Sequence, residues 1–149
     1  MVKFIWHEAP VPEKLPVHQV YGVLFTDDGR IILKVDGGFH GLIGGKPEPG
    51  ETHEETLIRE VYEEVNCEIS QLHYLGYQTV HGDGKPYAQL RYVAKIDKIG
   101  KNRPDLDGGK IYERLLVGQT DAAKTLDYGP EGEQIIDAAI RAAKKHHLI

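Results

Sequence analysis

Cysteine is nearly absent from this chain, which has Cys67 as its one thiol among 149 residues. A lone cysteine excludes an internal disulfide and a metal site built from several thiolates. No stretch approaches the roughly 20 apolar residues of a membrane span, and the N-terminal MVKFIWHEAPVPEK lacks the apolar core of a signal peptide. These absences predict a protein that is located in the reducing cytoplasm and is neither inserted in nor bound to a membrane.

Basic residues are outnumbered by acidic ones, with 18 Lys and Arg against 23 Asp and Glu and a net charge of -5. No run of Lys and Arg forms a patch, which argues against binding to a nucleic acid polymer. The 40% hydrophobic and 28% charged residues are ordinary for a globular protein. Because a chain of this length buries one core and is short for two, we predict a single domain over 1–149.

Prolines, glycines and β-branched residues divide the chain into expected elements. Residues 1–16 contain three prolines and suit an extended N-terminal arm. Residues 37–51, with six glycines and two prolines, predict a long functional loop. Predicted strands, paired as two hairpins plus one further strand, cover 17–26, 31–36, 70–80, 86–96 and 110–118. Predicted helices cover 52–65, 120–127 and 132–148. Strand pairs mixed with helices predict an α/β or α+β fold.

The helix after the glycine-rich segment has clear end signals. Thr52 followed by Glu55 is a capping-box pattern, and Asn66 suits the left-handed position just past a helix end. At 100° per residue one arc of this helix is apolar and is expected to face the sheet. The residues of that arc are Leu57, Ile58, Val61, Tyr62 and Val65.

Three glutamates of the same helix share its other side. Glu60, Glu63 and Glu64 are spaced i, i+3 and i+4, so their carboxylates are neighbours. Like charges at this spacing destabilise a helix by about 0.2–0.5 kcal/mol per pair, and a divalent cation reverses that effect. Mg²⁺ is often held by one or two carboxylates together with substrate phosphates. A solvated acidic face is the alternative interpretation of these residues on their own.

The loop and the helix together form a longer pattern that favours the metal site. It reads Gly45, five residues, Glu51, seven residues, Arg59-Glu60-Val61, one residue, Glu63-Glu64. In this pattern, which extends over Gly45 to Cys67, the chain resembles the Nudix hydrolases. The resemblance implies a mixed β-sheet sandwiched between helices, and hydrolysis of a nucleoside diphosphate linked to another group.

The resemblance also implies roles for individual residues. Glu60, Glu63 and Glu64 would help to bind Mg²⁺ or Mn²⁺, and the backbone carbonyl of Gly44 often joins such a set. Glu51 and Arg59 would hold loop and helix in register as an ion pair. Gly45 would let the loop turn tightly and would lie among the substrate-binding residues. Asn66, Cys67 and Ile43 depart from the usual residues of the family, and none of the three replaces a metal-binding carboxylate.

The general base has two possible origins. Relatives use either a glutamate of the helix or a carboxylate from a later loop, so Glu63 or Glu64 compete with Asp105, Asp107 and Glu113. We favour the helix, because the three later residues also suit loop formation or the outward side of a strand.

Residues for binding the nucleoside are only weakly indicated. Aromatic side chains that could stack on a base are Phe39, His40, Tyr77, Tyr87 and Tyr92, although aromatic residues in strands are more often core. Basic side chains that could meet phosphates are Lys46, Arg30 and Arg91, with ordinary surface charge as the alternative.

The substrate is expected to be a small nucleotide. The short chain is more similar to the compact nucleoside triphosphate pyrophosphatases than to the longer ADP-sugar enzymes. ADP-ribose and dinucleoside polyphosphates remain alternatives, although Pro86 and Tyr87 lie a few residues later than the proline and tyrosine that mark some of those enzymes. A Nudix-fold regulator that binds nucleotide without turnover is a further alternative, and a homodimer is possible.

Overall fold

The computed structural model describes residues 1–149 as one mixed sheet with three helices. The strands are β1 Lys3–His7, β2 Val17–Phe25, β3 Ile31–Asp36, β4 Phe39–Gly41, β5 Ile43–Gly45, β6 Cys67–His81, β7 Tyr87–Ile99 and β8 Glu113–Val117. The helices are α1 His53–Val65, α2 Ala122–Leu126 and α3 Pro130–Lys145. The predicted fold class, a mixed sheet between helices, is confirmed.

The sheet joins parallel and antiparallel pairs. Its main path runs β1-β6-β7-β2-β3-β4, with β5 paired to β2 and β8 paired to β3. Strands β2 and β7 are parallel from Val17 opposite Ala88 to Phe25 opposite Lys95, with a register shift between Val17 and Gln19, and the other pairs are antiparallel. A parallel pair needs a crossover connection, and here the crossover carries β3, β4, β5, α1 and β6.

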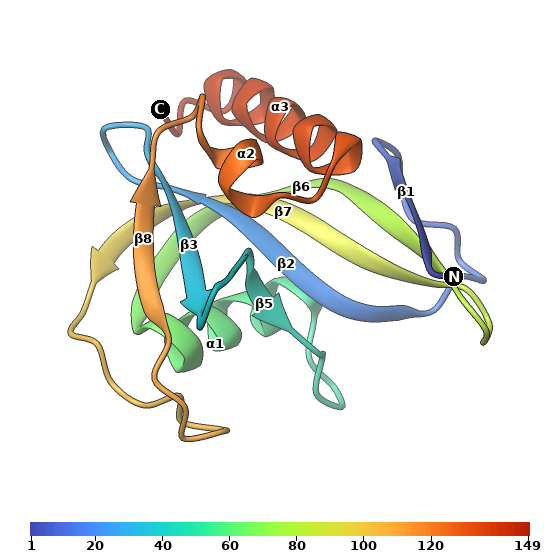
Figure 1. Cartoon of the computed structure of the whole chain (residues 1–149), viewed down its shortest axis with the longest axis horizontal. Helices are drawn as coiled ribbons and strands as arrows, with labels where there is room; N and C mark the ends of the chain where they lie inside the picture. Colours follow the sequence, from blue (N-terminus) through green and yellow to red (C-terminus); the bar gives the residue numbers. More distant parts are fainter.

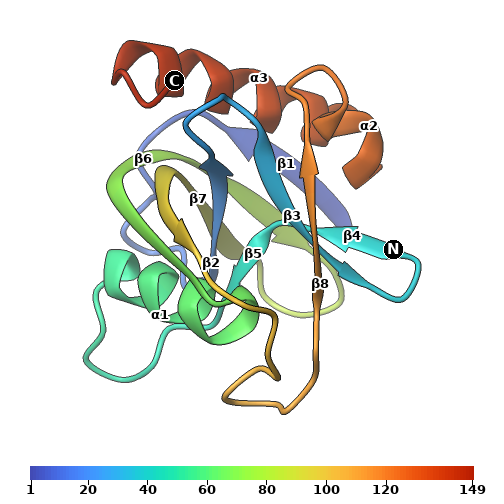
Figure 2. The same cartoon turned by 90° about the vertical axis from the view of Figure 1, so that its left-hand side faces the viewer.

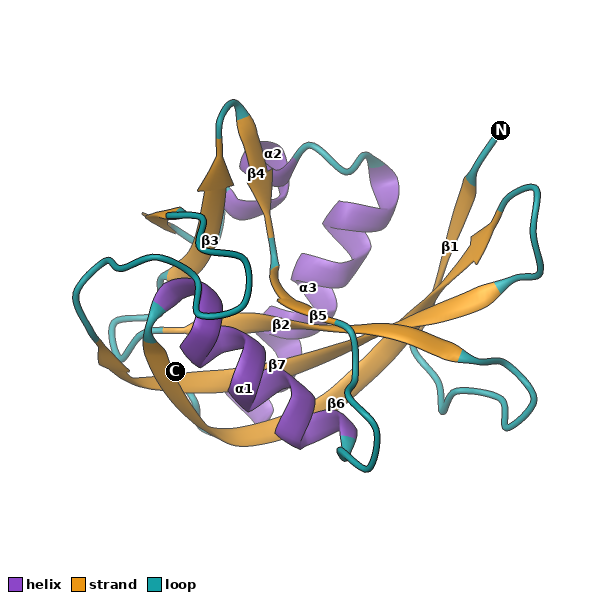
Figure 3. Ribbon diagram, turned by 90° about the horizontal axis from the view of Figure 1, so that it is seen from below, coloured by secondary structure: helices purple, strands orange, loops and turns teal.

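The helices cover both faces of the sheet. Helices α2 and α3 lie on one face and α1 lies on the opposite face (Figures 1 and 2). The core is correspondingly divided into a cluster of 16 buried residues under α2 and α3 and a cluster of 15 under α1. Seen from below, α1 crosses the strands of its face obliquely (Figure 3). Each face of the sheet is therefore packed against at least one amphipathic helix.

The two predicted hairpins differ in how fully they pair. Strands β6 and β7 pair along their length, from Cys67 opposite Ile99 to Val80 opposite Tyr87. Strands β2 and β3 are joined by a tight turn with Gly29 at φ +80°, but they pair only at Phe25 and Ile31. Beyond this pair the strands separate, because β3 continues the sheet with β4 and β8.

Two stretches expected to be irregular contain strands. Residues 1–16 are not an extended arm throughout, because β1 pairs with the edge of β6 and only the proline-containing part after it is irregular. Residues 37–51 are not one long loop, because β4 and β5 interrupt it. At β5 the glycines allow close backbone approach, since Gly44 lies opposite Tyr21 of β2. None of the three helices combines the length and the apolar character that a membrane span requires.

Candidate active site

Helix α1 begins and ends as its sequence predicts. The Thr52 hydroxyl accepts a hydrogen bond from the Glu55 amide at 3.1 Å, and the Glu55 carboxylate accepts one from the Thr52 amide at 2.8 Å. At the other end Asn66 has φ 51° and ψ 49°, and its amide donates to the Tyr62 carbonyl. These caps fix where the helix starts and stops, and therefore which residues face the sheet.

The buried side of α1 is rotated from the predicted apolar arc toward the glutamates. Leu57, Val61 and Val65 are buried as expected. Ile58 and Tyr62 are 44% and 48% exposed, so their predicted contact with the sheet is wrong. The helix instead turns Glu64, which is only 5% exposed, toward the sheet. This orientation brings carboxylates against β5 rather than leaving them on a solvated face.

Glu60 lies directly against β5. A methyl group at Gly45 would come within 2.5–2.7 Å of the Glu60 carboxyl atoms, so Glu60 can take this position only because residue 45 has no side chain. Burial raises the pKa of Glu60 to about 7, with Arg59 opposing the rise and the charges of Glu64 and Glu63 adding to it. Gly45 therefore allows the Glu60 carboxylate to lie against the backbone of β5. Burial there disfavours the charged form of Glu60.

Glu64 is held by groups from β3 and β5. Its Oε2 atom accepts a hydrogen bond from Lys34 Nζ at 2.6 Å, and its Oε1 atom accepts one from the Gly44 amide at 3.2 Å. A side chain at Gly44 would collide with the Val20 carbonyl, so only glycine permits this approach. Burial raises the pKa of Glu64, Lys34 opposes the rise, and the charge of Asp105 adds to it.

Arg59 connects the loop to the remaining glutamates. Its Nε and Nη2 atoms donate to the two oxygens of Glu51 at 2.6 and 3.1 Å, and Nη1 donates to Glu60 at 2.9 Å and Glu63 at 3.3 Å. Nη2 also donates to the Lys46 carbonyl at 2.9 Å. The ion pair expected between Glu51 and Arg59 is thus present, and it lowers the pKa of Glu51 to about 2.

The three expected metal ligands lie around Arg59 and Lys34 rather than around a common point. No group of three or more His, Cys, Asp or Glu side chains is arranged to hold a metal ion. The two cations account for this arrangement, since Arg59 contacts Glu60 and Glu63 while Lys34 contacts Glu64. The donor set still suits a hard cation, because it consists of carboxylate oxygens from neighbouring positions of one helix.

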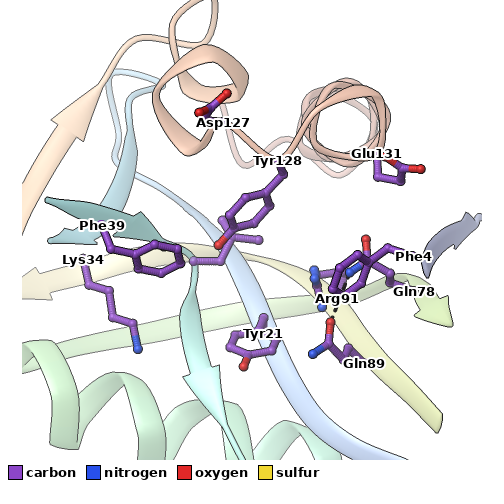
Figure 4. Close-up of a pocket in the computed structure, with 12 residues that line it drawn as sticks. Phe4, Tyr21, Lys34, Phe39, Gln78, Gln89, Arg91, Asp127, Tyr128 and Glu131 are labelled. Carbon is purple, nitrogen blue, oxygen red and sulfur yellow. Dashed lines mark hydrogen bonds between the residues drawn. The ribbon is translucent and has the colours of Figure 1, made fainter. Parts of the chain in front are cut away.

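A cavity of about 530 Å³ is lined by Lys34, the residue that also contacts Glu64. It opens between the sheet and the segment joining α2 to α3 (Figure 4). Its twelve lining residues are Phe4, Tyr21, Lys34, Phe39, Gly41, Leu42, Gln78, Gln89, Arg91, Asp127, Tyr128 and Glu131. The volume falls within the range of about 300–1,000 Å³ typical of ligand pockets. Because Lys34 also holds Glu64, the cavity adjoins the glutamates of α1.

Of the residues expected to bind substrate, some lie at the cavity or the glutamates and others lie away from both. Phe39 lines the cavity and is 58% exposed, and Gly45 contacts Glu60. Lys46 has an exposed side chain, and its carbonyl accepts a hydrogen bond from Arg59, whereas Arg30 pairs with Asp28 in the β2–β3 turn. Tyr87 stacks on His18 with ring centroids 4.1 Å apart and does not line the cavity.

Of the remaining aromatic candidates, Tyr77 and Tyr92 are 7% exposed and belong to the core under α1. The alternative of a core role therefore holds for both residues. His40 is half-buried in β4 and is not among the residues that line the cavity.

The later carboxylates lie on the segment leading into β8. Asp105 is half-buried, and its charge acts on Glu64. The Asp105 carboxylate also accepts a hydrogen bond from the Asp107 amide at 2.9 Å, which fits the expected role in loop formation. Glu113 is exposed on β8 opposite Val35. Asp105 is thus the one of these three whose charge acts on a helix glutamate.

Sequence reasoning missed two residues of the site and misjudged a third. Lys34 follows three buried residues of β3, and a lysine directly after such an apolar run is a signal that could have marked it. Tyr128 lies in an irregular connection, where no pattern points to the cavity. Arg91 is not surface charge, since it is 3% exposed in the middle of β7. A charged residue between apolar neighbours in a long strand was the available sign.

Comparison with known proteins agrees with this geometry. The model of the NUDIX domain matches residues 16–126. The chain belongs to the Nudix family. Solved Nudix folds resemble it over most of its length. The pyrophosphohydrolase BsRppH of Bacillus subtilis has a TM-score of 0.72 at 19% identity, covering 95% of this chain and 90% of that one. A NUDIX hydrolase from Nitrosomonas europaea has a TM-score of 0.66 at 22% identity, covering 87% and 90%.

Curated Nudix relatives match over shorter stretches. The NAD-capped RNA hydrolase NudC of Pseudomonas putida (strain W619) is 44% identical over an alignment of 113 positions that covers 64% of this chain and 41% of the relative. A candidate 8-oxo-dGTP diphosphatase, YtkD of Bacillus subtilis (strain 168), is 43% identical over 58 residues, 39% of this chain and 37% of the relative. The alignments thus span about two fifths of the length of these curated relatives.

Proposed function

We propose that this protein is a metal-dependent nucleoside triphosphate pyrophosphatase, which converts a nucleoside triphosphate and water into a nucleoside monophosphate and pyrophosphate. The observation that carries the proposal is the position of Lys34, which both lines the cavity and holds Glu64 of α1. A nucleotide whose base lies in the cavity would extend its phosphates past Lys34 toward the glutamates. The Nudix membership of the chain supports this chemistry.

The glutamates are suited to bind a divalent cation, Mg²⁺ or Mn²⁺. Glu60, Glu63 and Glu64 would hold it, with the Gly44 carbonyl as a further oxygen donor. When bound, such a cation neutralises the bridging oxygens and lowers the pKa of a water molecule. Both Glu60 and Glu64 have pKa values raised mainly by burial, and a nearby cation would favour their charged forms.

The side chains around the glutamates would position the reacting groups. Arg59 fixes Glu60 and Glu63 relative to the loop through Glu51, and Lys34 fixes Glu64. Glu63 or Glu64 would take the proton from the water that attacks phosphorus, while the bond from that phosphorus to the bridging oxygen breaks. The leaving diphosphate would meet the exposed Lys46 at the edge of the site.

Two other functions are supported by particular observations. The NudC relatives, named as NAD-capped RNA hydrolases, align with 64% of the chain. They favour a dinucleotide or another nucleoside diphosphate derivative, such as ADP-ribose or a dinucleoside polyphosphate, as the alternative substrate. A regulator that binds nucleotide without turnover is the second alternative, and the presence of every glutamate of the motif argues against it.

A substrate panel tests the proposal. The purified chain is incubated with ribo- and deoxyribonucleoside triphosphates, ADP-ribose, NADH, dinucleoside polyphosphates and NAD-capped RNA, with Mg²⁺, with Mn²⁺ and with a chelator. We expect pyrophosphate and a nucleoside monophosphate to accumulate fastest from a triphosphate, and only with the cation. Faster cleavage of NADH, ADP-ribose or capped RNA would replace the proposed substrate. Nucleotide binding with no cleavage of any of them would identify a regulator.

The cytoplasmic location, the single domain and the homodimer remain predictions from the sequence. Size-exclusion chromatography with light scattering would measure the mass of the assembly directly. The same preparation, tested against uncapped RNA, would show whether a nucleic acid polymer is bound.

A further inference from the structure

A buried guanidinium in the sheet has too few partners. Arg91 is 3% exposed, and its one side-chain hydrogen bond is a long one, from Nη1 to the Leu90 carbonyl at 3.4 Å. Its Nε atom is buried with no hydrogen-bond partner. No carboxylate lies within ion-pair distance of it, since every ion pair of the chain involves other residues. A charge in this position is unfavourable unless something else satisfies it.

The protein compensates for this charge only in part. Burial lowers the pKa of Arg91 to about 10, so the group is still charged at neutral pH. The guanidinium carbon lies 4.9 Å from the centre of the Tyr21 ring, and this contact supplies some attraction to the cation. Because Arg91 lines the cavity and its Nη2 atom makes no hydrogen bond within the chain, an acceptor on a bound molecule can meet the guanidinium there.

The other walls of the cavity indicate a flat molecule. Phe4, Tyr21, Phe39 and Tyr128 contribute aromatic rings, which are suited to stack on a planar group. In Figure 4, Arg91 and Lys34 lie at opposite ends of the residues drawn, with Tyr21 and Tyr128 between them. Since Lys34 touches Glu64, the Arg91 end is the one remote from the glutamates. A nucleotide with its phosphates at the glutamates would place its base there.

Glutamines beside Arg91 provide a second type of hydrogen-bonding group. Gln78 donates to Gln89 at 3.1 Å, and Gln89 donates to Gln19 at 3.1 Å. This row leaves the Oε1 atom of Gln78 without a donor from the chain, and Gln78 lines the cavity. The end of the cavity thus combines unused guanidinium donors with one unused amide acceptor.

We propose that Arg91 and Gln78 select guanine among the nucleobases. This inference rests on the proposed function, because it names the base of the nucleotide that this site would cleave. Guanine carries two neighbouring acceptors, O6 and N7, which match the planar donors of arginine. Its N1–H and N2–H₂ donors suit the Gln78 acceptor. Adenine has a donor at N6 next to N7 and would leave one Arg91 donor facing another donor.

Substrate analogues test this proposal with the unaltered protein. The values of kcat/KM are measured for dGTP, dATP and 7-deaza-dGTP, and the Kd values of GMP, AMP and 7-deaza-GMP are measured by calorimetry. Loss of N7 removes one of the two acceptors, so we expect kcat/KM for dGTP to exceed that for both other triphosphates by about tenfold. The Kd of GMP should be the lowest of the three. Values within twofold of one another would overturn the proposal.

The two measurements separate this inference from the proposed function. Hydrolysis of all triphosphates at similar rates would leave the pyrophosphatase in place and refute the guanine preference. A clear preference for GMP in binding, without hydrolysis of any triphosphate, would support the base selection and refute the pyrophosphatase.

Variants show whether Arg91 is the residue responsible. Arg91→Lys keeps the charge and loses the planar pair of donors, so the ratio of dGTP to dATP efficiency is expected to fall to within about twofold. Arg141→Lys is the matched control, because Arg141 is an exposed arginine paired with Glu8 away from the cavity. The control should keep the original ratio. An unchanged ratio in folded Arg91→Lys, judged by its Tm, would overturn the assignment.

A second variant covers the case in which Arg91→Lys does not fold. Gln78→Leu removes the acceptor and leaves Arg91 in place. It should weaken GMP binding more than binding of a nucleotide without N1–H and N2–H₂ donors, such as AMP. Equal weakening of both nucleotides would count against a base-reading role, because a purely structural defect does not distinguish between bases.

Discussion

Two charged regions on opposite faces of this sheet differ in whether their charges have partners within the chain. On the α1 face, the carboxylates of Glu60 and Glu64 each have a cation from the chain, Arg59 or Lys34. On the α3 face, Arg91 has no carboxylate at all and lines a cavity instead. Paired charges can be held in place by the protein alone, whereas an unpaired one depends on a ligand. The difference fits the proposal that the fold holds the acidic region in place and that a bound nucleotide completes the cavity.

The largest expected effect comes from removing a charge of the acidic region. Glu64→Gln keeps the shape of the side chain but loses its negative charge, which would act on the cation or on the attacking water. We expect kcat for pyrophosphate release to fall by about 10²–10⁴-fold. The matched control is Glu113→Gln, because Glu113 is an exposed glutamate of β8. A loss in the control as large as that of Glu64→Gln would move the general base to the later segment.

A smaller effect is expected when the backbone beneath Glu60 is changed. The added methyl group of Gly45→Ala would lie 2.5–2.7 Å from the Glu60 carboxyl atoms and would push that side chain away. Because misplacement of about 1 Å can reduce a rate by about 10²-fold, activity should drop by about 10–100-fold while Tm changes little. Gly38→Ala is the control, since a methyl group there meets nothing within 4 Å. Unaltered activity of Gly45→Ala would show that Glu60 is not confined by this glycine.

The contrast between paired and unpaired charges can be tested through stability. Arg59→Met removes the partner of Glu51, Glu60 and Glu63, and its loss should destabilise the fold by about 1.5–3 kcal/mol. Arg91→Met replaces a buried charge that has no acid partner, so the free energy of unfolding without ligand should be unchanged or higher. Urea denaturation of both variants provides the comparison. Equal destabilisation would mean that Arg91 is satisfied within the chain.

The parts of the site that are close in sequence were predictable, because local rules determine them. The capping box fixes the start of α1, and helical spacing then gathers Glu60, Glu63 and Glu64 on one side. The pairing of Glu51 with Arg59 links the loop to the second turn of that helix, and the family resemblance implied it. The predicted apolar arc failed at Ile58 and Tyr62 because the position of β5, which is a tertiary feature, sets the rotation of the helix.

The parts that depend on strand pairing were not predictable from this one sequence. Lys34 meets Glu64 across 30 positions because β3 and β5 both lie near α1. The cavity brings together residues from β1, β2, β3, β4, β6, β7, α3 and the segment between α2 and α3. Strand β1 itself was missed because proline-rich sequence follows it, and β5 was missed because glycine is a poor indicator of strands. Register between distant strands carries little local signal.

The last prediction concerns pH and the pair that supports the acidic region. Arg59 lowers the pKa of Glu51 from its ordinary value of 4.5 to about 2. A carboxylate with a lowered pKa stabilises the fold above its unfolded pKa, and this contribution disappears as the pH falls through its folded pKa. The stability difference between the unaltered protein and Glu51→Gln should therefore be largest near pH 7 and shrink between about pH 4.5 and 2. Glu13→Gln, at an exposed glutamate, corrects for the loss of one surface charge. A difference that stays constant with pH would show that Glu51 acts through packing, and the acidic region would then not depend on the charge of this pair.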